Sequence, residues 1–118
     1  MIAVRMKHYR LVLFSQPACK PCKKVKEHLA SLPDDQRLEI ELQPFKTPDG
    51  EITPFAKQCG VTLSPTLVVL ADSIYCIKEE DEEYCDVTYA PVESVVGGKA
   101  IIKQLHVLLQ TYTYAIAE

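Results

Sequence analysis

The segment that decides the fold lies at residues 12–26 and has the sequence VLFSQPACKPCKKVK. It closes a nearly continuous apolar run, Tyr9 to Ser15, which predicts a strand buried on both faces of a sheet. It then opens a helix predicted over Lys20–Ser31. The apolar residues expected to share one face of this helix are Ala18, Cys22, Val25, Leu29 and Leu32. Cys19 and Cys22 therefore lie at the junction between a buried strand and the helix that follows it.

The position of this cysteine pair predicts its chemistry. At a helix N-terminus, unpaired backbone N–H groups and the macrodipole favour negative charge. A cysteine there is more readily a thiolate, which is the nucleophile in disulfide exchange. Lys20, Lys23 and Lys24 add positive potential nearby. We therefore expect Cys19 to be the attacking thiolate. Cys22, one turn into the helix and on its buried face, would be the resolving thiol that releases the mixed disulfide.

The pair has two other possible interpretations. A structural zinc ion usually takes four ligands, commonly from two such pairs. Cys59, Cys76 and Cys85 are single and widely spaced, and the three histidines form no paired ligand motif, so we expect no metal. The remaining interpretation is a chance pair without function, against which the strand–CxxC–helix context argues.

The rest of the chain continues the alternation of strands and helices. We expect a half-buried strand with Leu38, Ile40 and Leu42 turned inwards, and a short helix over 54–59 that Thr53 caps and Gly60 ends. Further elements are a strand over 66–70, a strand-like stretch over 71–96 and a closing helix over Lys99–Tyr112. The predicted order is β-α-β-α-β-β-α, with two parallel strands in the first βαβ unit and a final hairpin. This is an α/β fold with a mixed four-stranded sheet flanked by helices, in a single domain over residues 1–118.

The composition limits the kinds of protein that this chain can be. The 118 residues are 47% hydrophobic and 25% charged, which is ordinary for a globular domain. A net charge of −3 without an Arg-rich stripe excludes a basic nucleic-acid surface. No apolar run approaches the roughly 18 to 20 residues that span a membrane, and residues 1–10 lack the pattern of a signal peptide. Because five cysteines are an odd count, a secreted disulfide scaffold is disfavoured. We expect a cytoplasmic monomer without membrane or nucleic-acid partners.

The stretch 12–26 resembles the active-site segment of the thioredoxin and glutaredoxin superfamily. A second mark is 61–69 (VTLSPTLVV), because the family has a cis-proline before its central antiparallel strand, and Pro65 is the matching residue. A third is 95–105 (VVGGKAIIKQL), which resembles the family's passage from last strand to last helix. The residues that the resemblance implies for substrate binding are Ser64, Pro65, Thr66, Lys20 and Gly97.

The chain departs from the family pattern at several positions. Thioredoxins carry a buried Asp where this chain has Leu13, and a Trp where it has Ala18. Residues 1–8 alone precede the predicted first strand, so a minimal glutaredoxin-type core fits better. Glutaredoxins, however, usually place Tyr at Pro21, and an acidic residue follows their glycine pair where Lys99 stands here.

The resemblance implies a thiol–disulfide oxidoreductase that reduces protein disulfides by dithiol exchange. It needs no bound cofactor, since the dithiol is itself the redox group, and a reductase or glutathione would restore it. The alternative is a non-catalytic thioredoxin-like module that docks a partner around Cys19, Pro65 and Gly97. A disulfide oxidase or isomerase is a third reading, which Pro21 and the lack of a signal peptide disfavour.

The final hairpin holds the last motif. If Glu80 and Asp81 form a two-residue turn, Cys76 lies opposite Cys85 in a non-hydrogen-bonded pair, with Cα atoms roughly 4.5 Å apart. This distance is at the near end of disulfide reach. The two cysteines are either a second redox pair or, as a reducing compartment favours, two reduced thiols. The acidic run over 79–83 is either a solvated turn or a docking handle for basic partners. Cys59 is expected to be a buried, inert thiol.

Overall fold

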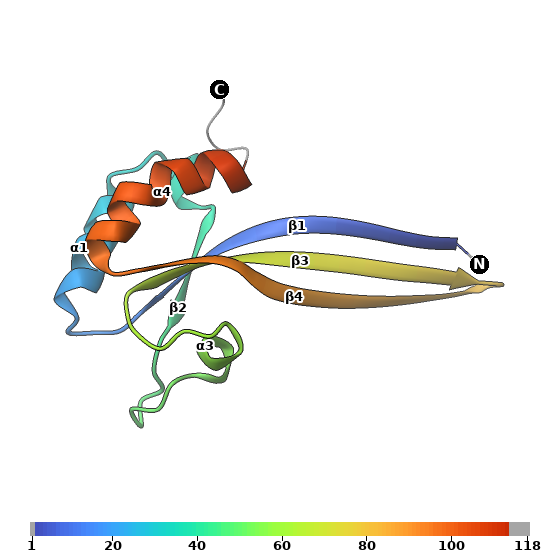
Figure 1. Ribbon diagram of the computed structural model, residues 1–118, viewed down its shortest axis with the longest axis horizontal. Helices are drawn as coiled ribbons and strands as arrows, with labels where there is room; N and C mark the ends of the chain where they lie inside the picture. Colours follow the sequence, from blue (N-terminus) through green and yellow to red (C-terminus); the bar gives the residue numbers. More distant parts are fainter. Residues whose placement is uncertain (1, 114–118) are drawn as a thin grey trace.

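The computed structural model describes the backbone of residues 2–113 and the side chains of residues 8–113 (Figure 1). The strands are β1 (Ile2–Ser15), β2 (Ile40–Pro44), β3 (Thr66–Glu79) and β4 (Glu82–Val96). The helices are α1 (Lys20–Ala30), α2 (Asp34–Arg37), α3 (Pro54–Gln58) and α4 (Gly98–Tyr112). In this described part, four strands form one sheet in the order β2-β1-β3-β4, with β1 and β2 parallel and the other neighbours antiparallel. The predicted mixed α/β sheet is confirmed.

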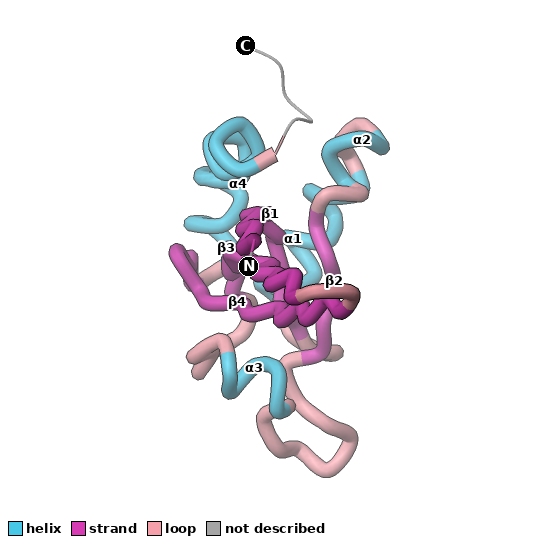
Figure 2. Tube along the Cα trace, turned by 90° about the vertical axis from the view of Figure 1, so that its right-hand side faces the viewer, coloured by secondary structure: helices cyan, strands magenta, loops and turns pink. Residues whose placement is uncertain are grey.

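Two hydrophobic layers enclose the part of the sheet nearest the cysteine pair. The layer under α1 and α4 is built around Leu11, Leu13, Val25, Leu67 and Leu105. The layer under α3 is built around Val12, Phe14, Ala56, Val68 and Leu70. Figure 2 shows α4 and α3 on opposite sides of the strands. Because both faces of this strand segment are covered, its apolar run is continuous rather than alternating.

Helix α1 follows its predicted pattern with one exception. Cys22, Val25 and Leu29 are buried, while the lysines of the helix face water. Ala18 does not share the buried face, since it precedes the helix and is exposed. Its φ of 59° places it in the left-handed region, where the chain turns from β1 into α1.

The predicted secondary structure requires three corrections. The first strand begins at Ile2 rather than Tyr9, because residues 2–9 pair with the far half of β3. An unpredicted short helix, α2, precedes β2, so the observed element order differs from the predicted one. Leu38 is the C-cap of α2 and is exposed, and Leu42 is exposed because β2 is an edge strand paired on one side only. Of the three inward positions expected in that strand, Ile40 alone is buried.

Helices do not flank the whole sheet as predicted. Beyond them, β1, β3 and β4 continue as a three-stranded extension that we call the blade, residues 2–9, 71–79 and 82–91 (Figure 1). The blade gives the molecule principal extents of 55 × 42 × 20 Å. The predicted turn at Glu80 and Asp81 is confirmed, and so is the pairing of Cys76 with Cys85.

A break in register marks the base of the blade. Val69 pairs with Glu93 and Leu70 pairs with Pro91, so Val92 is an extra residue in β4. A bulge and a proline are both tolerated on an edge strand, where the missing N–H faces solvent. They also hinder pairing with another chain along this edge. Among the described residues, no helix is long and apolar enough to cross a membrane.

Candidate redox site

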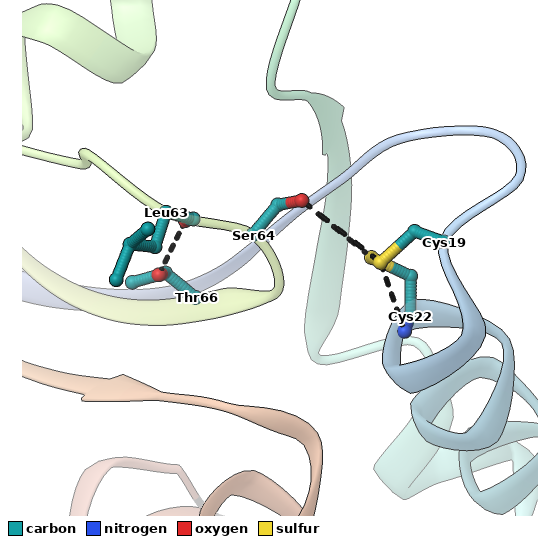
Figure 3. Close-up of a disulfide and its surroundings, with 5 residues drawn as sticks. All are labelled: Cys19, Cys22, Leu63, Ser64 and Thr66. Atoms are coloured by element: carbon teal, nitrogen blue, oxygen red, sulfur yellow. Dashed lines mark hydrogen bonds between the residues drawn. A yellow bond between two sulfur atoms is a disulfide. The ribbon is translucent and has the colours of Figure 1, made fainter.

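Cys19 and Cys22 form a disulfide at the N-terminus of α1, with Cα atoms 5.2 Å apart (Figure 3). Cys19 is the N-cap residue, and its Sγ accepts a hydrogen bond from the backbone N–H of Cys22, with an N···S distance of 3.3 Å. The two cysteines differ in access, since Cys19 is partly exposed and Cys22 is 1% exposed. The predicted placement of the pair at a helix start is confirmed.

The electrostatic surroundings of Cys19 are positive. The first turn of α1 contains no acidic residue, and Lys20, Lys23 and Lys24 are exposed around it. The helix macrodipole adds partial positive charge at this end. When the disulfide is reduced, these groups favour the thiolate form of the N-cap cysteine.

The loop before β3 packs against the disulfide. The Ser64–Pro65 peptide bond is cis, as the family resemblance implied. Ser64 Oγ lies 4.0 Å from Cys19 Sγ and 3.8 Å from Cys22 Sγ (Figure 3). The Thr66 hydroxyl donates to the carbonyl of Leu63 at 2.7 Å and is buried, so it braces the loop rather than facing the groove.

Gly97 and Gly98, at the start of α4, bring a third segment to the site. The N–H of Gly97 donates to the carbonyl of Pro65 at 2.9 Å. The φ of Gly97 is 97°, a conformation that side chains strongly disfavour. A Cβ on Gly98 would lie 3.1 Å from the Pro21 carbonyl oxygen, so α4 approaches the CxxC segment closely because this residue has no side chain. Three stretches far apart in sequence thus meet at the disulfide.

Two open grooves flank the start of α1. The groove beside the disulfide has a volume of about 640 Å³, and its lining includes Pro17, Cys19, Lys23 and Lys26. The second has a volume of about 490 Å³ and runs between Pro21 and the glycine turn. Lys20 contributes to both grooves. The first groove therefore opens directly onto Cys19, and the second lies beyond Lys20 and Pro21.

Sequence reasoning missed part of the first groove. Gln16, Pro17, Lys26 and Glu27 line it beside the cysteines, but none was predicted as a site residue. Helical periodicity could have indicated two of them. Lys23, Lys26, Glu27 and Ala30 follow one another at spacings of three, one and three along α1, which places them on one face.

The other cysteines lie apart from this site. Cys59 is a buried thiol at the end of α3, as expected. Its burial raises the pKa of the thiol, and the positive charge of the nearby Arg10 guanidinium offsets this rise only in part.

Cys76 and Cys85 form a second disulfide, with Cα atoms 4.1 Å apart. Within the described residues, the group with donors close enough for a metal ion is Cys76, Glu83 and Cys85, whose ligand atoms lie within 4.8 Å of one another. Both of its sulfurs are engaged in the disulfide.

No protein-family model matches this chain, and no curated protein matches it.

Proposed function

We propose that this chain is a thiol–disulfide oxidoreductase of thioredoxin-like fold that reduces disulfides in other proteins. One observation carries the proposal. The Cys19–Cys22 disulfide caps a helix and lies against the cis Ser64–Pro65 loop. A disulfide that only stabilises a fold has no need of a positive helix terminus or of an open groove beside it.

Each cysteine has a distinct role in the proposed reaction. In the reduced protein, Cys19 attacks a substrate disulfide, forming an S–S bond to one substrate sulfur and expelling the other as a thiolate. Cys22 then attacks Cys19 Sγ, which regenerates the observed disulfide and releases the second substrate thiol. Two electrons pass to the substrate. The order of attack follows from access, since Cys22 is only 1% exposed and a protein disulfide cannot reach it first.

The segments around the disulfide would hold the substrate chain. Ser64 lies beside the sulfurs, and the Gly97 N–H donates to the carbonyl of Pro65, which fixes the cis loop next to it. Lys20, which borders both grooves, would attract acidic substrate segments. A reductase or glutathione would restore the dithiol, and the proposed reaction uses no bound cofactor.

The roles are tested by reduction of insulin disulfides with dithiothreitol as the electron source. Replacing Cys19 with Ser should reduce the rate at least about a thousandfold, as is usual on removal of a nucleophile. Replacing Cys22 with Ser should instead accumulate a mixed disulfide through Cys19, which mass spectrometry detects. Cys59→Ser is the matched control and should keep full activity. Unchanged turnover in Cys19→Ser would contradict the assignment.

The midpoint potential of the pair distinguishes the donors. It should be measured in a variant with Cys59, Cys76 and Cys85 replaced, against glutathione or dithiothreitol buffers. A value near about −270 mV would favour a flavoprotein reductase as donor, and one of roughly −200 to −230 mV would favour glutathione. If no two-electron transition occurs, the chain is not a redox protein, and the docking-module alternative replaces this proposal.

A further inference from the structure

The Cys76–Cys85 disulfide occupies an exposed position near the end of the blade. It joins directly opposed residues of β3 and β4. Cys85 is exposed and Cys76 is partly exposed. The two β4 residues on either side of Cys85, Tyr84 and Asp86, are exposed as well. A macromolecular thiol can therefore reach this disulfide from solvent.

The two disulfides of one molecule are too far apart to react with each other. Thr66 begins β3 at the candidate site, and Cys76 lies ten residues further along the same strand. A strand rises about 3.3 Å per residue, so the separation is about 33 Å. Figure 1 shows α1 at one end of the molecule and the hairpin turn at the other. Any exchange between the pairs must take place between two copies of the chain.

The charges at the two ends are complementary. The hairpin turn carries the exposed run Glu79-Glu80-Asp81-Glu82-Glu83. Three lysines, Lys20, Lys23 and Lys26, border the groove beside Cys19, against one acid, Glu27. Opposite potentials of this kind steer two surfaces together and set their orientation. The acidic turn of one copy is thus attracted to the end of another copy where the proposed nucleophile lies.

We propose, resting on the proposed function, that the Cys76–Cys85 disulfide is a second redox centre, reduced by the Cys19–Cys22 dithiol of another copy of this chain. Cys19 of the first copy attacks the blade disulfide, the bond between the two blade sulfurs breaks, and one of them leaves as a thiolate that takes up a proton. Cys22 then attacks Cys19 Sγ and releases the second blade thiol. One disulfide is lost and one is formed, so two electrons move from one copy to the other.

Access and charge select the sulfur that is attacked. Cys85 is the more exposed of the two cysteines. Glu83 Oε1 lies 3.5 Å from Cys85 Sγ, and a carboxylate disfavours a thiolate at that sulfur. Cys76 is then the better leaving group, since a leaving sulfur departs faster when its thiolate is more stable. The expected intermediate is a Cys19–Cys85 disulfide between copies.

The transfer can be measured between two complementary variants. The donor carries Cys76→Ser and Cys85→Ser and is fully reduced, then freed of reductant. The acceptor carries Cys19→Ser and Cys22→Ser with its blade disulfide oxidised. After anaerobic mixing at equal concentrations and trapping with an alkylating agent, peptide mapping should show labelled Cys76 and Cys85 in the acceptor and a Cys19–Cys22 disulfide in the donor. A donor with the additional change Cys22→Ser should stop at the Cys19–Cys85 link.

Insulin as a second acceptor separates the two proposals. If the donor reduces insulin but leaves the blade disulfide intact, this inference is overturned and the proposed function stands. If the donor reduces neither, both fail. If the acceptor cannot be oxidised at Cys76 and Cys85, the inference fails irrespective of the donor.

The contribution of charge is tested on the acceptor, outside the proposed catalytic residues. Glu80→Gln with Asp81→Asn should slow transfer at low salt by at least about threefold, because steering depends on these charges. Glu39→Gln with Glu51→Gln removes the same number of exposed acids elsewhere and should change the rate by less than about twofold. Equal rates for the two acceptors would overturn docking through the acidic turn.

Discussion

The same three strands behave differently in the two halves of the sheet. Near the candidate site, β1 and β3 lie between two helical layers, and their residues 11–14 and 67–70 are almost completely buried. In the blade the strands keep their pairing, but the described helix contacts lie at its base, where Tyr9 meets α4 and Tyr89 meets α3. Further out, Tyr84 and Val87 are more than half exposed. Hydrogen bonding between strands is therefore enough to extend the sheet, whereas burying its side chains requires a layer of helices packed on its face.

The blade is held by other means than a core. At its base, the Tyr89 ring packs edge-on against Phe55 with centroids 5.9 Å apart, and its hydroxyl donates to Gln58. Near its end, the Cys76–Cys85 disulfide joins β3 to β4. Among the described side chains of β3 and β4, few large ones are buried between these two points. The blade is thus expected to open more readily than the rest of the sheet, because local stability follows buried contacts.

The two halves should differ most in how much unfolding free energy is lost when a large side chain is replaced with Ala. Leu67→Ala removes a side chain that is 1% exposed between β3 and the α1–α4 layer. It should lower the free energy of unfolding by about 2–5 kcal/mol, owing to lost burial and a residual cavity. Val87→Ala, at a position 60% exposed in the blade, should change it by less than about 0.5 kcal/mol. Urea titrations at fixed redox potential measure both, and equal losses would mean that the blade has a core of its own.

A smaller effect is expected when the cross-link of the blade is removed. Replacing Cys76 and Cys85 with Ser opens a loop whose ends are nine residues apart in sequence. Chain entropy limits the loss to about 2.5 kcal/mol. Amides in 71–79 and 82–91 should exchange faster with deuterium, while those of 11–14 should remain protected. Faster exchange throughout the sheet would show that the two halves open together.

The smallest expected effect is a difference in the alkylation rates of two thiols, Cys59 and Cys85. After full reduction at neutral pH, Cys59 should react with iodoacetamide at least about tenfold more slowly than Cys85. Burial limits access to Cys59 and raises its pKa, so less thiolate is present at a given pH and its reaction should rise only at higher pH. Cys85 has no such cover. Equal labelling rates would indicate that the α3 layer opens as readily as the blade.

The two disulfides also differ in their surroundings. Cys19–Cys22 lies at a helix N-terminus with lysines around it, and Cys76–Cys85 lies between two strands beside an acidic turn. The first environment favours a thiolate, which suits an attacking group. The second lacks a helix terminus and suits an accepting disulfide. This difference is the physical basis for the opposite roles proposed for the two pairs.

The sequence by itself determined the features that depend on neighbouring residues. The apolar run 9–15 predicted a strand covered on both faces, and the spacing of Cys22, Val25 and Leu29 predicted the buried side of α1. The two-residue turn predicted the Cys76–Cys85 pairing, because the register of a hairpin follows from its turn. The cis bond at Pro65 was inferred from family resemblance, not from local physics.

Only the tertiary structure decided the features that depend on distant partners. Residues 2–8 carry no strand signal strong enough to stand alone, and they became strand because β3 offered an unpaired edge. Leu42 alternates correctly with its neighbours yet stays exposed, since β2 ends the sheet. The meeting of Ser64, Gly97 and the cysteine pair likewise required the fold, because local sequence sets local conformation but cannot specify which segments the layers bring together.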